Sequence, residues 1–147
     1  METPVNAQRK ALEILCGTGD LDAVGDWLSP DHVLHQSVIE GLPPGLAATL
    51  DLARFYRRAL PGLEVSIEDA FGEGDRAVTR FRVRARHTGK LGAIAPTSAA
   101  VEVTGILESR FGEDGRAAES WLEVGALGVL RALDVLEMVN PVRVVES

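Results

Sequence analysis

The chain has 147 residues, 46% hydrophobic and 25% charged, which fits one globular domain over residues 1–147 and excludes a disordered chain. The formal net charge of −7 disfavours nucleic-acid binding, and the single cysteine, Cys16, excludes an internal disulfide and a thiolate metal cluster. Neither a basic leader nor a stretch of about 18 apolar residues is present, so we expect a cytoplasmic protein that does not contact a membrane.

The first part of the chain favours helices. Apolar residues recur at helical spacing from Val5 to Thr18, from Leu21 to Leu28 and from about Leu46 to Leu60. Asp20 is placed to cap the second, short helix with its side chain. Between the second and third helices, residues 29–31 (Ser-Pro-Asp) predict a turn, and the residues that follow look extended.

From Leu63 the pattern changes to an alternation of apolar and polar residues, which is typical of β-strands. Four strands are predicted, over residues 63–71, 76–87, 101–111 and 116–124, and residues 125–136 are expected to start extended and end helical. The Asp-Gly pair at 114–115 is a strong hairpin signal, because both positions of such a turn favour left-handed backbone angles. Helices followed by an antiparallel meander predict an α+β fold, with the helices on one face of the sheet.

The second predicted strand has two distinct sides. Ala77, Phe81, Val83 and His87 lie on one side with Thr79, and four arginines lie on the other. We expect the apolar sides of the strands, including Leu107 on the third strand, to form a concave face. The arginines are expected to pair with glutamates of neighbouring strands on the convex face, which argues against a nucleic-acid patch.

The fourth strand is ambiguous by pattern alone. Glu119, Trp121 and Glu123 share one side with Gly125, and Ser120, Leu122 and Val124 share the other. If the first side faces a pocket, desolvation raises the pKa of its carboxyl groups toward values useful for proton transfer. If it faces water, Leu122 and Val124 are buried instead.

The histidines and Tyr56 are the remaining polar candidates for a site. His32 and His35 point to opposite faces of a strand, so we expect no shared metal ion and no metal site. His87 ends a strand, where it either contacts the pocket or bonds to the backbone. Tyr56 lies on an amphipathic helix, where an aromatic ring is either core or pocket wall.

Short motifs spread along the chain resemble one known family. They are Asp31–His35, Tyr56–Pro61, Gly74–Arg76, Arg86–Gly89, Ala95–Thr97, Arg110, Asp114–Arg116, Glu119, Trp121, Gly128–Leu130 and Leu133. In this order and spacing they resemble the SnoaL-like polyketide cyclases, within the nuclear-transport-factor and ketosteroid-isomerase superfamily. The resemblance implies a cone-shaped, curved antiparallel sheet wrapped around the N-terminal helices, which enclose a deep apolar pocket.

The resemblance also implies an activity and a set of site residues. Members of the family close rings in polyketide precursors without a cofactor or metal, and use an Asp four residues after the Trp as acid and base. That position is Gly125 here. The resemblance favours the side of the fourth strand that carries Trp121 as the pocket side. Glu123 lies two residues before Gly125 on the same side of the strand and is the candidate to replace the missing Asp, and His87 and His35 match family positions near the pocket, so these three are the expected catalytic residues. The implied substrate-binding residues are Trp121, Phe81, Tyr56, Glu119, Val83 and Leu107.

Two classes of function follow. The first is a cofactor-free cyclase of natural-product biosynthesis that acts on a small-molecule polyketide. It works either by an aldol reaction through Glu123 or Glu119, or by a shape-driven [4+2] closure, which the missing Asp favours. The second is a non-catalytic small-molecule binding domain. In either case the superfamily implies a homodimer through the convex faces.

Overall fold

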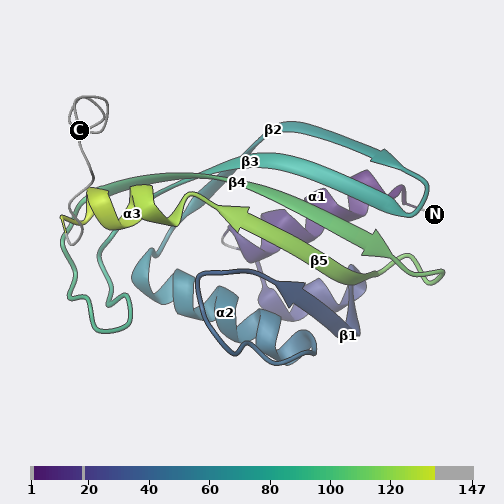
Figure 1. Ribbon diagram of the computed structural model, residues 1–147, viewed down its shortest axis with the longest axis horizontal. Coiled ribbons are helices and arrows are strands. Elements are labelled where there is room, and N and C mark those ends of the chain that lie inside the picture. The colour runs from purple at the N-terminus through teal and green to yellow at the C-terminus, as the bar shows by residue number, and fades with distance from the viewer. Residues whose placement is uncertain (1, 18, 135–147) are drawn as a thin grey trace, which may run out of the picture.

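The computed structural model of the chain describes residues 2–17 and 19–134 (Figure 1). Its elements, in chain order, are α1 (Pro4–Leu15), the 3₁₀ helix η1 (Leu21–Asp26), β1 (Leu28–His35), α2 (Leu46–Ala59), β2 (Glu64–Glu73), β3 (Arg76–Arg86), β4 (Ala100–Phe111), β5 (Ala117–Val124) and α3 (Ala126–Ala132). The predicted helices and the four long strands are confirmed to within a few residues. The segment after Gly125 is helical over Ala126–Ala132, and the residues from 135 on, which include the C-terminal tail from Met138, lie outside the described residues.

The first two helices begin where the sequence supplies a cap. The Thr3 hydroxyl accepts a hydrogen bond from the backbone N–H of Asn6 (3.2 Å), and Pro4 occupies the first turn, where a missing N–H costs nothing. The Asp20 carboxylate accepts from the N–H of Asp22 (3.0 Å) at the start of η1, which confirms the predicted cap. Among the described residues no helix is long and apolar enough to cross a membrane.

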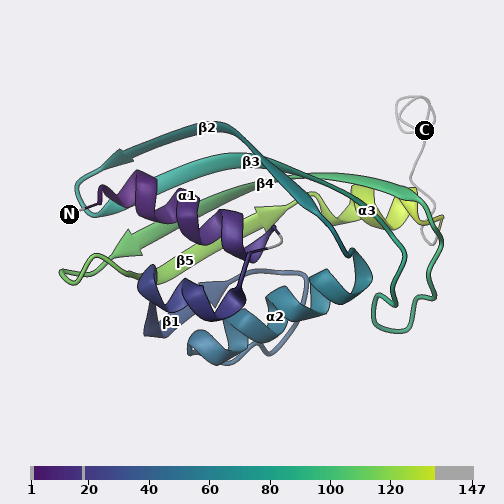
Figure 2. The ribbon, with the colours of Figure 1, turned by 180° about the vertical axis from the view of Figure 1, so that it is seen from behind.

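The five strands form one curved, unclosed sheet in the order β1-β5-β4-β3-β2. Helices α1 and α2 lie on one face of it (Figure 2). β2 to β5 pair antiparallel as predicted, but β1 adds to the edge in parallel with β5. The turn predicted at residues 29–31 is wrong, because these residues belong to β1. Pro30 lacks an N–H for the ladder and is tolerated on this edge strand, where the register is irregular.

The concave face of the sheet is apolar, as the alternation in β3 predicts. Phe81 (2% exposed), Val83 and Leu107 join the buried cluster that packs against α1 and α2. Gly105 lies directly opposite Phe81 in β4, and a Cβ there would come within 2.5 Å of the Phe81 ring. The missing side chain at Gly105 therefore makes room for the Phe81 ring.

The convex face carries the predicted network of arginines and glutamates. Arg82 bonds to Glu68 (2.5 Å) and to Glu102, Arg84 bonds to Glu102 (3.1 Å), and Arg80 bonds to Glu68 (3.0 Å). Three of the four arginines of β3 are therefore paired with glutamates of β2 or β4, as predicted, whereas Arg86 donates to the carbonyl oxygen of Ser98 (2.9 Å).

The prediction that the Trp121 side of β5 faces the pocket is wrong. Phe111 pairs with Ala117, but Arg110 pairs with Glu119, so Ala118 is an extra residue in β5. Without this bulge Leu107 would face Trp121; with it, Leu107 faces Leu122. Because a shift of one residue exchanges the two faces of a strand, the bulge turns Glu119, Trp121 and Glu123 to the convex side.

Candidate functional site

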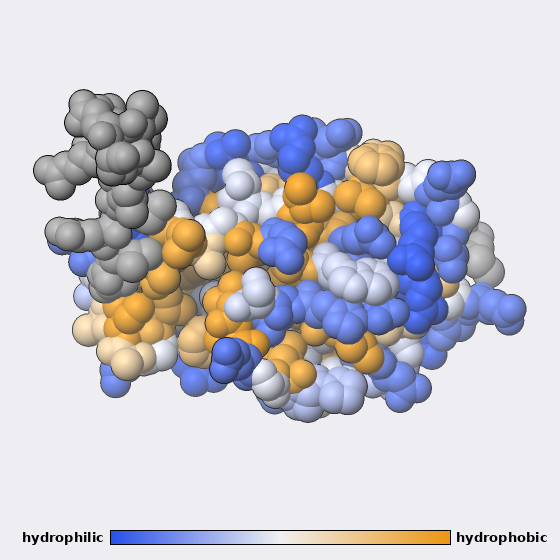
Figure 3. Space-filling model, in the orientation of Figure 1, coloured by the Kyte–Doolittle hydropathy of each residue, from blue (hydrophilic) through white to orange (hydrophobic). Residues whose placement is uncertain are grey.

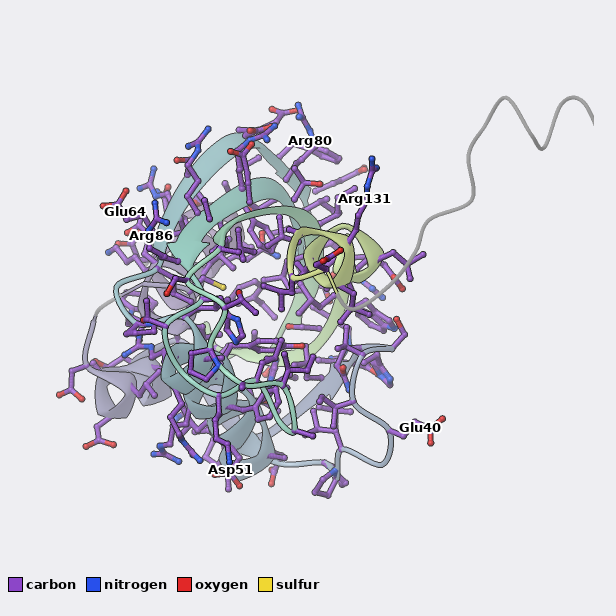
Figure 4. The ribbon with its side chains drawn as sticks, turned by 90° about the vertical axis from the view of Figure 1, so that its left-hand side faces the viewer. Glu40, Asp51, Glu64, Arg80, Arg86 and Arg131 are labelled. Carbon is purple, nitrogen blue, oxygen red and sulfur yellow. The ribbon has the colours of Figure 1, made fainter. Side chains whose placement is uncertain are left out.

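A cavity of about 390 Å³ lies between the concave face of the sheet and the helices. Its wall is built from α1, α2, α3, the inner faces of β1, β3, β4 and β5, and the loops that contain Val38 and Leu91. Figure 4 looks at the α3 side of the molecule, and the six charged side chains that it labels point away from the interior. Apolar residues gather around α3 on the surface (Figure 3), where Leu127 is 58% exposed.

The cavity wall is almost entirely uncharged. Among the described residues that line it, none is Asp, Glu, Lys or Arg. The polar side chains of the lining are Gln8, His32, Gln36, Thr49, Tyr56, Ser109 and Ser120. A cavity of this size and polarity suits a small, apolar molecule that is held in orientation by a few hydrogen bonds.

Five of these polar side chains form one continuous buried chain of hydrogen bonds. The Gln8 amide nitrogen is 3.0 Å from Ser109 Oγ, which is 2.9 Å from Ser120 Oγ. Ser120 Oγ is 2.9 Å from His32 Nε2, and His32 Nδ1 is 2.9 Å from the Thr49 hydroxyl. Each residue comes from a different element, so the chain ties α1, β4, β5, β1 and α2 together at the cavity wall.

Burial keeps the titratable groups of the lining neutral. His32 is 1% exposed, and burial lowers its pKa from 6.5 to about 4; Glu119 opposes this shift and His35 adds to it. Burial raises the pKa of the Cys16 thiol to about 12 and also raises the pKa of Tyr56. These three groups therefore carry no charge near neutral pH.

Four of the predicted substrate-binding residues do line the cavity. Phe81, Val83 and Leu107 come from the concave face of β3 and β4, and Tyr56 comes from α2. Of the two positions considered for Tyr56, core or pocket wall, the structure places it in the wall, where its ring packs edge-on against Phe55 at 5.3 Å between centroids.

The other predicted residues of β1 and β5 form a cluster on the convex side. His35 Nε2 is 2.7 Å from the Glu119 carboxylate, and the His35 ring stacks on Trp121 at 5.3 Å. The hydrogen bond from His35, with Arg110 nearby, lowers the pKa of Glu119. Glu123 is exposed. The structure brings His35, Glu119 and Trp121 together, but outside the cavity, because of the bulge in β5.

His87 is fully buried but does not belong to the lining. The backbone N–H of Thr97 donates to His87 Nδ1 (3.2 Å), and the Thr97 hydroxyl lies 2.9 Å from the same atom. Nδ1 therefore accepts, and the proton of the neutral ring is on Nε2, which has no partner among the described side chains and backbone. Of the two roles considered for His87, the bond to the backbone is the one seen.

Gly125 stands where the family resemblance places an acidic residue. It lies between β5 and α3, and its N–H donates to the carbonyl of Thr104 (3.0 Å). A Cβ built at Gly125 meets its nearest atom, the Thr104 carbonyl oxygen, at 3.8 Å, so a side chain has room to start there. The glycine is not required by its backbone or by close packing.

The buried polar chain is not among the features predicted from the sequence. The predicted placement of His32 and His35 on opposite faces of their strand is confirmed. The parity of β4 indicates that Ser109 faces inward with Leu107, and this signal was available in the sequence. Gln8 carried no comparable signal, because a single amide on an amphipathic helix is usually exposed.

Comparisons with known proteins agree with this architecture. The model of the SnoaL-like polyketide cyclase family matches residues 6–133. A search of curated protein sequences finds no match to this chain. AclR from Streptomyces galilaeus, a proposed hydroxylase, is 24% identical with a TM-score of 0.77, over 99% of this chain and 95% of its own.

Two further solved structures share the fold. IdmH from Streptomyces antibioticus, a proposed polyketide cyclase, is 23% identical with a TM-score of 0.77, over 91% of this chain and 100% of its own. TsrD from Streptomyces laurentii is 22% identical with a TM-score of 0.78, over 92% of this chain and 100% of its own. At these identities the three structures establish the fold and carry no statement about substrate.

Proposed function

This chain belongs to the SnoaL-like polyketide cyclase family, and we propose on that premise that it closes a ring in a linear, uncharged polyketide intermediate. The observation that carries the proposal is the cavity itself, which is large, apolar and lined, in the described part of the chain, by neutral groups alone. Such a cavity supports catalysis that depends on the shape of the bound chain rather than on a strong base.

The reaction that fits this environment is an intramolecular [4+2] cycloaddition. A conjugated diene and an alkene of one chain lose two π bonds and form two carbon–carbon σ bonds, and the remaining π bond moves to the middle of the former diene. No proton or electron leaves the substrate. Holding the reacting ends about 3–3.5 Å apart supplies several kcal/mol of the barrier by removing unproductive conformers.

The aldol alternative has less support. Glu123 is exposed on the face of the sheet opposite to the cavity, and Glu119 is engaged with His35 and Arg110. Gly125 removes the acidic residue that the family resemblance implies at that position. Within the cavity the remaining titratable group with an ordinary pKa near neutrality, His32, is held neutral by burial.

The test is the rate of ring closure of a synthetic linear polyene ketone, measured by chromatography with and without the protein. The proposal predicts a rate above the spontaneous one for the wild-type chain and for Ser66→Ala, a change on the exposed face of β2. Ala53→Phe, which fills the cavity from α2, should return the rate to the spontaneous value.

A non-catalytic binding domain is the second candidate, and Gly125 is the observation that favours it. The same experiment separates the two functions. A ketone that binds in the cavity of the wild-type chain, but whose cyclisation is no faster than in buffer, would identify a binding domain and contradict the cyclase.

The homodimer and the cytoplasmic location stay predictions. The convex face supports a dimer through Ile106, a large apolar side chain of β4 that is 49% exposed beside the paired arginines and glutamates. A second copy of this face would bury Ile106 and supply further charge pairs at its rim.

A further inference from the structure

The buried chain from Gln8 to Thr49 has a fixed polarity at its Gln8 end. The Gln8 amide nitrogen lies 3.1 Å from the Ala77 carbonyl oxygen and 3.0 Å from that of Leu107. Carbonyl oxygens only accept hydrogen bonds, so this atom is the NH₂ group. With this orientation the Thr79 hydroxyl donates to the amide oxygen (2.6 Å). The NH₂ group has two hydrogens for its three acceptors, so one hydrogen is shared, and Ser109 Oγ can only accept from this group.

The rest of the chain has two self-consistent directions. In the first, Ser109 donates to Ser120, Ser120 donates to His32 Nε2, and His32 Nδ1–H donates to Thr49. In the second, Thr49 donates to His32 Nδ1, His32 Nε2–H donates to Ser120, and Ser120 donates to Ser109. Both directions keep every member neutral and use both nitrogens of the ring.

Each direction leaves one hydroxyl hydrogen without a partner inside the chain. In the first direction it belongs to Thr49, and in the second to Ser109, and both residues line the cavity. The two hydroxyls differ as donors. In the second direction Ser109 Oγ accepts from both Gln8 and Ser120, whereas in the first Thr49 accepts from His32 alone. Because accepted hydrogen bonds polarise a hydroxyl, Ser109 is the stronger donor.

We propose that this chain is the subsite for a carbonyl oxygen of the substrate, which accepts from Ser109 and sets the chain in its second direction. In this direction the proton of the His32 ring is on Nε2, and the ring is neutral in both directions, so the net charge of the site does not change on binding. The inference rests on the proposed function for the nature of the substrate, and it adds where the polar group binds and what it must be.

The subsite also defines which molecules the cavity rejects. A carboxylate or phosphate would be buried against neutral groups, since no cation belongs to the described lining, and an unpaired buried anion is strongly disfavoured. A hydrocarbon of the same shape fits the apolar wall but leaves the Ser109 hydrogen unused. The favoured ligand is therefore an uncharged, apolar chain with a carbonyl at one end.

The test compares three molecules of matched shape, namely 2-undecanone, 2-methyl-1-undecene and decanoate, by calorimetry with the full chain. The ketone should bind about fivefold to tenfold more tightly than the alkene, as one neutral hydrogen bond provides, and decanoate more weakly than both. Ser109→Ala should bind ketone and alkene equally, whereas the exposed control Ser66→Ala should keep the preference.

The second readout is the tautomer of His32, measured by NMR on protein labelled with ¹⁵N-histidine. The His32 signals are assigned by their loss in His32→Gln, which separates them from those of His35 and His87. With 2-undecanone the His32 proton should be on Nε2, and with the alkene the tautomer should match that of the free protein. Equal affinities for ketone and alkene in the wild-type chain would overturn the proposal, as would a bound ketone with the proton on Nδ1 or binding of none of the three.

These measurements need no turnover, so they are separable from the cyclase assay. A preference for the ketone without ring closure in the cyclase assay would contradict the proposed function and support the subsite. Ring closure in that assay without a preference for the ketone would support the proposed function and contradict the subsite. If Ser109→Ala does not fold, the wild-type affinities and the NMR tautomer still decide.

Discussion

The buried, neutral His32 should make the protein lose stability in mild acid. The ordinary pKa of the ring is 6.5 and the folded value is about 4, because burial disfavours the imidazolium. The unfolded chain therefore binds a proton that the folded chain does not between these two values. The contribution of the neutral His32 ring to the free energy of unfolding is fully present above pH 6.5 and is lost as the pH falls toward 4.

The size of this loss follows from the two pKa values. They differ by about 2.5, and one pKa unit is worth about 1.4 kcal/mol, so the contribution is about 3 kcal/mol in full and about 2–3 kcal/mol at pH 4.5. The groups that face His32 are Glu119, which opposes the shift, and His35, which adds to it by a smaller amount.

Urea denaturation between pH 7 and 4.5 measures this contribution, with His32→Gln as the matched variant that cannot titrate. Because the carboxylates titrate in both proteins, the stability that the wild-type chain loses beyond the loss of the variant is due to His32. The wild-type chain should lose about 2–3 kcal/mol more than the variant. Equal losses would refute the reasoning. If the variant does not fold, NMR titration of His32 in the wild-type chain decides, and a value near 6.5 would refute it equally.

Three further outcomes follow from the structure. Glu123→Gln should leave the cyclisation rate within about threefold, whereas loss of a general base would cost about a hundredfold or more. In urea denaturation, Phe81→Ala should lower the free energy of unfolding by about 3–5 kcal/mol. Gly105→Ala should lower it by about 1–3 kcal/mol, because the added Cβ meets the Phe81 ring. Gly125→Ala is the near-neutral control, because the atom nearest to its added Cβ is 3.8 Å away. Ile106→Glu should convert the expected dimer to a monomer in analytical ultracentrifugation, and a wild-type chain that sediments as a monomer would contradict the dimer.

The sequence predicts well those features that depend on local pattern. The alternation in β3 assigns Phe81 and Val83 to the concave face, and the helical spacing locates α1 and α2. The arginine and glutamate partners across β2, β3 and β4 follow from the same alternation, because each strand has a strongly charged side and a strongly apolar side.

The sequence does not predict features that depend on register between strands. Each side of β5 carries both polar and apolar residues, so the alternation does not show which side is buried. The orientation depends on one extra residue, Ala118, which no local pattern reveals. The polar chain depends on five elements that meet only in the folded protein. His32 lies three residues from His35, and only the placement of β1 beside β5 decides which histidine enters the cavity.

In the proposed reaction, ring closure depends on the shape of a neutral cavity and not on an ionised base. The pH dependence of kcat for the polyene ketone tests this proposal most directly. His32 and Cys16 titrate outside the range from pH 6 to 9, at about 4 and at about 12, and burial raises the pKa of Tyr56 further away from this range. A catalysed rate that is flat across this range is the predicted result, and a rate that rises or falls through a midpoint within it would contradict the account.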